Sequence, residues 1–265
     1  MGKEQKCYMC SKVATSREHV PPLCLFPENK DTKGIDFRKN LITVPSCDLH
    51  NSKKSTDDEF LMLSLSGLIK SNPIGTFHQL TKGNRALRRK NKDFIEKEIL
   101  RNHRYGKIPS TNGKFRIVSI GNPNIERLLK CLKHIAYGLF RHEFDRKFVG
   151  EIRVIVEFIE YNDENRQTLK KFLKRRFELE EILNLGVKGA NPEVFFYEFH
   201  KPDNYGLIGL RTVFYGAAEA YFSFIDENSK EPFNLGMKLI EGGTHTIIQL
   251  GEEEFEFNKI CDNKK

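Results

Sequence analysis

The sequence predicts an α+β protein in three consecutive segments, and three observations support that prediction. Two pairs of metal-ligating residues lie within the first 50 positions, Cys7 with Cys10 and Cys47 with His50. A basic middle segment carries apolar residues at helical spacing. After residue 150, short β-branched and apolar runs alternate with Gly, Pro, Asn and Asp. We therefore expect a small metal-organised module, a basic helical segment, and a C-terminal mixed α/β domain with a largely antiparallel sheet.

The expected segments are 1–66, 67–150 and 151–265, and charge separates the last two. Residues 61–150 contain 19 Lys and Arg against 6 Asp and Glu, whereas residues 151–265 contain 15 against 21. The positive excess of the whole chain, +8, therefore lies in its middle third. A basic surface of this kind attracts a polyanion. A solvated helical face that keeps the protein in solution explains the same charge equally well.

Local patterns set the expected elements of each segment. Helices are expected at 57–68, 84–104, 124–144 and 163–185, from first-turn acids, caps or apolar residues at helical spacing. Strands are expected at 115–120, 152–159, 194–199, 206–215, 220–225, 237–240 and 244–250. Asn124 is expected to cap the helix that follows it, since an Asn side chain can accept a hydrogen bond from the first turn.

The two Cys/His pairs indicate a structural zinc site. Each pair has two intervening residues and can present both ligands from one tight turn. Together they supply the tetrahedral sulfur and nitrogen set that zinc prefers: Cys7, Cys10, Cys47 and His50. Zinc binding to such short segments contributes on the order of 10–16 kcal/mol, more than a few dozen residues gain by burial. The alternative is that Cys47 and His50 are unrelated surface residues.

A carboxylate and an imidazole are adjacent between the two pairs, at Glu18 and His19. Phosphodiester hydrolysis needs a divalent ion that neutralises the scissile phosphate and a base of near-neutral pKa that takes a proton from water. Glu18 can supply an oxygen ligand, His19 can be the base, and Asn51 can supply a second oxygen ligand from the start of a helix. Taken alone, a histidine in a His-x-Pro-Pro pattern, such as His19, more often has a structural role than a catalytic one.

The order of these features resembles that of zinc-containing HNH (ββα-metal) nucleases: Cys-x2-Cys, an acid–His pair, Asn-Leu, and Cys-x2-Cys-Asn. The chain matches this order with Cys7 and Cys10, Glu18-His19, Asn40-Leu41, and Cys47 with His50-Asn51. There are two departures. His50 replaces the fourth Cys, which zinc tolerates, and Glu18 replaces the more common Asp, which lengthens the ligand by one methylene and affects metal preference.

The resemblance covers about a fifth of the chain and implies a zinc-stabilised ββα-metal module, with a β-hairpin that carries His19 as the base and a helix that carries Asn51. A catalytic Mg²⁺ or Mn²⁺ would lie between Glu18 and Asn51, Asn40 would hold the loop that orients His19, and the zinc would be purely structural. The implied activity is endonucleolytic hydrolysis of DNA, as in restriction or anti-phage defence, with 5′-phosphate and 3′-hydroxyl products. The alternative is a non-catalytic zinc-dependent module that binds nucleic acid or a protein.

The expected partner is nucleic acid, with double-stranded DNA as the form that the resemblance implies. Contacts are expected from basic residues just after the motif and in the middle segment: Lys53, Lys54, Arg85, Arg88 and Arg89. The acidic segment 151–265 is a candidate surface for a protein partner or for homo-oligomer formation. No apolar run reaches the roughly 18 residues of a membrane helix, and no apolar leader is present, so we expect a cytoplasmic protein without membrane association.

Overall fold

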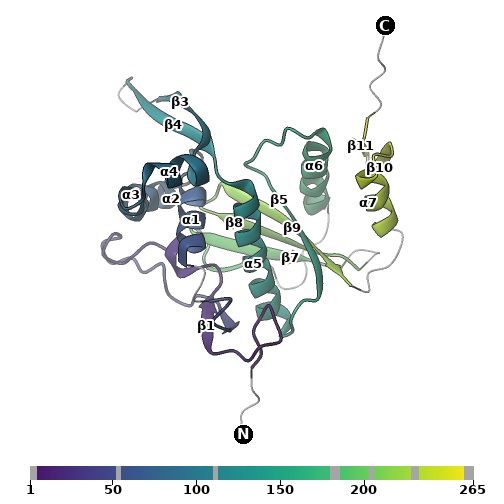
Figure 1. Cartoon of the computed structure of the whole chain (residues 1–265), viewed down its shortest axis with the longest axis horizontal. Coiled ribbons are helices and arrows are strands. Elements are labelled where there is room, and N and C mark those ends of the chain that lie inside the picture. The colour runs from purple at the N-terminus through teal and green to yellow at the C-terminus, as the bar shows by residue number, and fades with distance from the viewer. Residues whose placement is uncertain are drawn as a thin grey trace. The chain divides into compact units, whose positions relative to one another are not determined.

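A computed structural model describes residues 5–51, 55–109, 113–179, 186–202, 206–227 and 233–259. The chain is of mixed α+β class with antiparallel sheets, as the sequence predicts (Figure 1). Contacts divide it into two compact units, of which the first contains Met1–Lys147, Ala190–Phe195 and Phe214–Ala217 and the second contains the rest. Within the described ranges, none of the helices combines the length and the apolarity that a membrane crossing requires.

The first unit begins with a two-stranded antiparallel sheet that is followed by a helix. In chain order its elements are β1 (Ser16–His19), the short 3-10 helix η1 (Leu23–Leu25), β2 (Thr43–Ser46) and α1 (Ser55–Ser66). The register of the sheet pairs Glu18 with Val44 and His19 with Thr43. Two strands and a helix therefore occur in the predicted order, and the helix expected at 57–68 is confirmed as α1.

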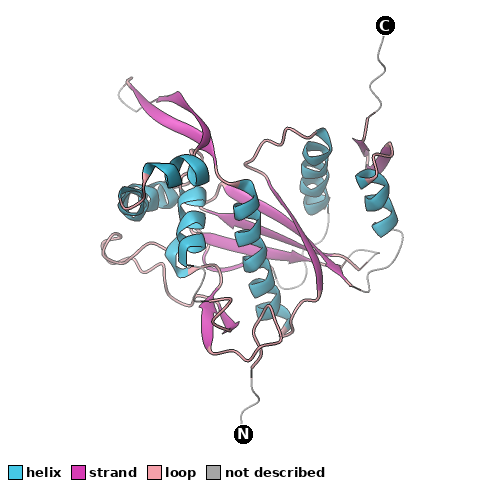
Figure 2. Cartoon of the chain, in the orientation of Figure 1, coloured by secondary structure: helices cyan, strands magenta, loops and turns pink. Residues whose placement is uncertain are grey.

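Short helices and one β-hairpin fill the next part of the first unit. They are α2 (Pro73–His78), η3 (Gln79–Gly83), α3 (Asn84–Arg88), α4 (Lys92–Phe94), η4 (Ile95–Ile99), β3 (Arg101–Pro109) and β4 (Phe115–Asn122). The single helix expected at 84–104 is wrong. The Asn91 side chain accepts a hydrogen bond from the Phe94 N–H and begins a new helix, and the chain enters β3 at Arg101. The strand expected at 115–120 is confirmed within β4, which pairs antiparallel with β3 (Figure 2).

Helix α5 (Ile125–Phe144) matches its prediction and holds the N-terminal sheet in place. Asn124 caps it by accepting a hydrogen bond from the Arg127 N–H. At Gly138 the helix comes so close to Val20 that an added Cβ would lie 2.6 Å from a Val20 Cγ atom. Because real side chains do not tolerate this distance, the glycine allows α5 to pack directly against the residue that follows His19.

The largest sheet has five strands in the order β5-β9-β8-β7-β6. Their bounds are β5 (Gly150–Val156), β6 (Lys188–Asn191), β7 (Phe195–His200), β8 (Ile208–Phe214) and β9 (Ala218–Asp226). β5 pairs antiparallel with β9, with Ile152 opposite Phe224. The strands expected at 152–159, 194–199, 206–215 and 220–225 are confirmed, with ends that differ by a few residues.

A smaller cluster in the second unit joins α6 (Glu164–Leu179), α7 (Phe233–Glu241), β10 (Thr246–Leu250) and β11 (Glu253–Phe257). Its buried residues are Ile240, Phe255 and Phe257. The strand expected at 237–240 is wrong, because this stretch lies in α7. A short apolar run does not distinguish strand from helix, and the helix directs both Met237 and Ile240 into the cluster from one face.

Candidate functional site

Four side chains from the two ends of the N-terminal module meet in one cluster. The ligand atoms of Cys7, Cys10, Cys47 and His50 all lie within 4.8 Å of one another. Cys7 and Cys47 are buried, and Cys10 and His50 are partly exposed. Such a cluster can hold a metal ion such as zinc, so the sequence-based grouping of these four residues is confirmed by their placement.

The distances within the cluster fit a tetrahedral ion. The Sγ atoms of Cys10 and Cys47 are 3.7 Å apart, and His50 Nδ1 lies 3.4 Å from the Sγ atoms of both Cys7 and Cys47. With Zn–S bonds of about 2.3 Å and Zn–N bonds of about 2.0 Å, a regular tetrahedron places two sulfurs about 3.8 Å apart and sulfur and nitrogen about 3.5 Å apart. The side chains therefore have the spacing of zinc ligands, with Nδ1 as the nitrogen donor.

The backbone around Cys7 favours a thiolate. Burial raises the pKa of Cys7, but hydrogen bonds from the backbone of Met9, Cys47 and Cys10 outweigh it and bring the pKa below its ordinary value. The Tyr8 N–H donates to the Pro45 carbonyl at 2.9 Å, which joins the first turn to β2. Since zinc binds the thiolate form of cysteine, this local structure favours the metal-binding form of Cys7, whereas burial raises the pKa of Cys10 in the same turn.

The acid–His pair lies on β1, with its two side chains in different surroundings. Neighbouring strand residues point to opposite faces of a sheet. Glu18 is 5% exposed, whereas His19 is only half-buried. On the His19 face, Arg17 donates to both the hydroxyl and the carbonyl of Thr43, which fixes that edge of the sheet. The structure thus presents His19 to solvent more than Glu18.

The environment of His19 favours the neutral imidazole. Burial first, and then the positive charge of Arg38, lower its pKa below the ordinary value of 6.5. Arg38 itself is held by hydrogen bonds from its guanidinium to the Phe26 carbonyl, at 3.1 and 3.3 Å. A neutral imidazole at pH 7 can accept a proton, which is the state that a general base requires. Sequence reasoning did not identify Arg38, because no motif links it to His19.

Asn51 lies beside β1, although not on a helix as predicted. It belongs to the turn after Cys47, and α1 begins at Ser55. Its side-chain amide donates to the Ser16 hydroxyl at 2.8 Å. Ser16 and Glu18 are two residues apart on a strand and therefore share a face. Asn51 thus contacts the face of β1 on which the Glu18 side chain lies.

A catalytic divalent ion would find few ligands on this side of β1. Across the described ranges, the Cys7, Cys10, Cys47 and His50 cluster is the one grouping of three or more Cys, His, Asp and Glu suited to a metal. Glu18 and Asn51 would supply two oxygen donors, so water and the phosphate would have to supply the others.

Asn40 lies at the entrance to β2 in an exposed turn, with a φ of 54° that Asn tolerates better than most residues. Within the described residues its side chain forms no hydrogen bond. Asn40 could therefore orient His19, as predicted, only through the backbone conformation of the turn. The neighbouring Ile42 carbonyl accepts a hydrogen bond from the Val20 N–H at 2.9 Å.

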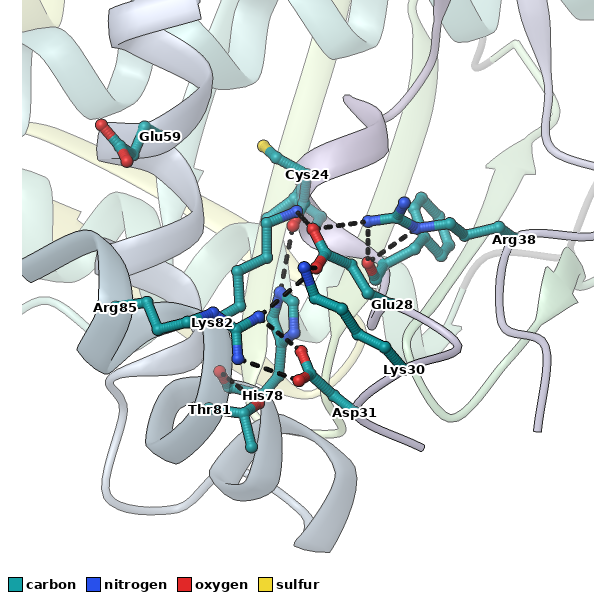
Figure 3. A network of polar contacts seen from close by, with 12 residues as sticks. Cys24, Glu28, Lys30, Asp31, Arg38, Glu59, His78, Thr81, Lys82 and Arg85 are labelled. Carbon is teal, nitrogen blue, oxygen red and sulfur yellow. Dashed lines mark hydrogen bonds and ion pairs between the residues drawn. The ribbon is translucent and has the colours of Figure 1, made fainter. Parts of the chain in front are cut away.

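A network of charges that sequence reasoning missed holds the connection between β1 and β2 (Figure 3). Glu28 lies at its centre, and a hydrogen bond from Lys30 together with the charge of Lys82 lowers its pKa to about 2. The other members are Asp31, Arg38 and Arg85. Arg85 binds Asp31 at 2.7 Å and so ties this connection to α3. These residues are far apart in sequence, and no spacing pattern marks them.

The residues predicted to contact nucleic acid lie in different environments. Lys53 and Lys54 lie outside the described residues. Arg85 binds Asp31, and Arg89 binds Glu59 at 2.9 Å. Arg88 is exposed on α3. Two of the predicted arginines therefore stabilise the first unit through ion pairs.

Comparisons with protein-family models, with curated proteins and with solved structures found no match to this chain. The function proposed below therefore depends on the residues of the site itself.

Proposed function

We propose that the first unit hydrolyses phosphodiester bonds of DNA as an HNH-type endonuclease, with His19 as the general base. The observation that carries the proposal is the position of His19, half-buried and with a lowered pKa, on a strand–strand–helix module whose ends meet in a Cys3His cluster. The order of its motifs, which resembles that of HNH nucleases, supplies the reaction class. Restriction or defence against phage is the biological role that we propose for such an activity.

In the proposed reaction, neutral His19 takes a proton from a water molecule whose oxygen attacks phosphorus in line. The bond between phosphorus and the 3′ oxygen breaks, and that oxygen takes a proton from solvent, which leaves 5′-phosphate and 3′-hydroxyl ends. Glu18 and Asn51 are the residues that would hold a divalent ion, which when bound would supply positive charge at the scissile phosphate. Their side chains lie on the face of β1 opposite to that of His19. The proposal therefore requires the phosphate to lie at the end of β1, where His19 is the last residue of the strand. Zinc at the Cys3His cluster would be structural, because all four of its positions are filled by side chains.

A plasmid-nicking assay tests the proposal. Full-length protein is incubated with supercoiled DNA with and without added Mg²⁺ or Mn²⁺, and zinc is measured in each sample to show that the structural ion is retained. Nicking should require the added ion, and His19→Ala should lower the rate by about 10²–10⁴-fold. The control is His142→Ala, because His142 is exposed on α5. Equal rates for His19→Ala and the wild type would refute the role of His19.

The burial of Glu18 favours a second candidate, a zinc-dependent module that binds nucleic acid without cutting it. A carboxylate that is 5% exposed is suited to anchoring β1 as well as to binding an ion. Binding of DNA by zinc-loaded protein that nicks neither with Mg²⁺ nor with Mn²⁺ would establish this candidate in place of the nuclease. Glu18→Gln separates the two roles, since it removes an ion ligand with little change of shape.

A further inference from the structure

The β3–β4 hairpin is an exposed, exclusively basic ribbon in the first unit. Residues 101–122 contain five Lys and Arg and no Asp or Glu. β3 is exposed over most of its length, and in Figure 1 the two strands extend away from α3 and α4. A two-stranded hairpin is by itself only marginally stable, so its charge and length need another explanation.

One face of the ribbon carries large apolar side chains in solvent. The register pairs Tyr105 with Ser119, Lys107 with Ile117, and Pro109 with Phe115, and residues that are opposite one another share a face. Tyr105 is 75% exposed, Phe115 57% and Ile117 68%. The Lys107 ammonium lies 4.6 Å from the centre of the Phe115 ring. This face, called here the ribbon face, therefore combines aromatic rings with a cation.

The base of the hairpin is fixed to the proposed catalytic module. Glu98, just before β3, accepts an ion pair from Arg127 of α5 at 3.2 Å, and Arg127 also binds Asp57 of α1 at 2.7 Å. The Asn124 N–H, just after β4, donates to the Glu98 carbonyl at 2.8 Å. Both ends of the ribbon are thus anchored to α1 and α5, and α5 also packs against β2 and Val20.

We propose that the hairpin binds single-stranded nucleic acid, with an unpaired base stacked on Tyr105 of the ribbon face. The backbone is held by Lys107 of that face and by Arg104, which directly precedes Tyr105 and lies on the other face of the ribbon. Positive charge without acids complements phosphates. Exposed rings complement unpaired bases, which have free π-faces, better than the closed stack of a duplex. Tyr105 and Phe115 are about 13 Å apart along the ribbon, at four residues of strand rise, so two separate bases of one strand can be accommodated.

This inference rests partly on the proposed nuclease function, because it defines the substrate as DNA with an unpaired stretch. The binding measurement is therefore made without cleavage. Full-length His19→Ala protein is titrated into a fluorescein-labelled 20-nucleotide strand and into the matching duplex, without added Mg²⁺, and anisotropy is recorded. Binding of the strand should be tighter than binding of the duplex. If the wild-type protein does not nick DNA, the binding result still stands, because it is measured without cleavage. Tighter binding of the duplex than of the strand overturns the proposed role of the ribbon face.

Variants assign the binding to the ribbon face. Tyr105→Ala should weaken strand binding at least about fivefold and duplex binding less than twofold, while Tyr105→Phe restores it. The control is Ile247→Ala on the exposed strand β10, where the side chain is 55% exposed. Thermal unfolding of each variant excludes a general loss of fold. Unchanged strand binding by Tyr105→Ala, or a weakening equal to that of the control, overturns the proposal.

Salt dependence tests the cations separately. The double change Arg104→Gln and Lys107→Gln should reduce the slope of log Kd against log salt for the strand by about 1.4, at about 0.7 for each lost phosphate contact. The matched control is Arg166→Gln with Lys171→Gln, two exposed cations of α6, which should leave the slope unchanged.

A change of oligomeric state in the ribbon variants with DNA binding intact would instead identify a protein interface, and would overturn the proposal.

Discussion

The side-chain amide of Asn51 donates a hydrogen bond to the Ser16 hydroxyl at 2.8 Å. Asn51 directly follows His50 of the Cys3His cluster, and Ser16 begins the strand that carries Glu18 and His19. The hydrogen bond therefore connects the metal-binding turn to the proposed catalytic strand. Loss of the metal should disturb both.

We expect Cys47→Ser to abolish zinc binding and to unfold the N-terminal module. A structural zinc contributes on the order of 10 kcal/mol, comparable with the 5–15 kcal/mol (about 0.1 kcal/mol per residue) that separates folded from unfolded domains. Zinc content by atomic emission and secondary structure by circular dichroism are the measurements. The control is Cys24→Ser, since the Cys24 thiol donates to the Asp58 carbonyl and a hydroxyl can do the same. Full zinc content in Cys47→Ser would show that the cluster is not the zinc site.

The nicking rate should rise with pH, with its inflection below the ordinary pKa of histidine. The base is active when neutral, and burial and Arg38 lower the pKa of His19, so activity is lost only as the pH falls through that lowered value. Single-turnover rates between about pH 5 and 8 measure the inflection. Arg38→Gln removes the nearby charge and should move the inflection to higher pH. Lys171→Gln, a distant charge change on α6, is the control, and an equal shift in both variants would contradict the role of Arg38.

Gly138→Ala should destabilise the first unit by about 1–3 kcal/mol and lower the nicking rate. The added methyl would meet Val20 at 2.6 Å, and this contact pushes α5 away from the end of β1. Urea unfolding with a parallel rate measurement tests this. Gly236→Ala in α7 is the matched control, since nothing lies within 4 Å of its added carbon and a helical alanine stabilises by about 0.5–1 kcal/mol. Equal stability of both variants would mean that the close approach has no energetic importance.

Glu28→Gln should lower the free energy of unfolding at pH 7 by about 1–3 kcal/mol. The lower end of this range allows for the screening of the ion pairs by solvent. The pKa of Glu28 falls from 4.5 to about 2 in the folded protein. A carboxylate whose pKa is lower in the folded than in the unfolded protein stabilises the fold at pH values above its unfolded pKa. This stabilisation is lost as the pH falls through the folded pKa. The difference between wild type and variant should therefore shrink between pH 4.5 and 2. A difference that stays constant across this range would exclude the ion pairs as its cause.

Sequence patterns identified the elements whose signals are local. Helix α5 combines an Asn124 cap with a long periodic face, and the four zinc-cluster residues are marked by two short spacings. Strand β3 was missed because its exposed, charged residues show no apolar alternation. Strand β11 was missed although Phe255 and Phe257 alternate with glutamates, a signal that a period-two search would detect.

The parts of the site that depend on distant residues could not be predicted. Arg38 lies 19 positions after His19, and Gly138 lies 118 positions after Val20. Their effects arise from packing, which single-sequence spacing does not encode. The burial of Glu18 is of the same kind, since the adjacent histidine is half-exposed and only the folded sheet distinguishes the two faces.

Tyr215 lies far along the chain from the module, but it belongs to the first unit. Its hydroxyl donates to the Leu25 carbonyl at 2.5 Å, and its ring lies 6.1 Å from that of His78. Asn72 likewise donates from its side chain to the Glu193 carbonyl. A fragment that stops at residue 147 would lack both later segments and expose the surfaces that they cover. Expression of a shortened protein for crystallisation or assay should therefore retain the chain through residue 217.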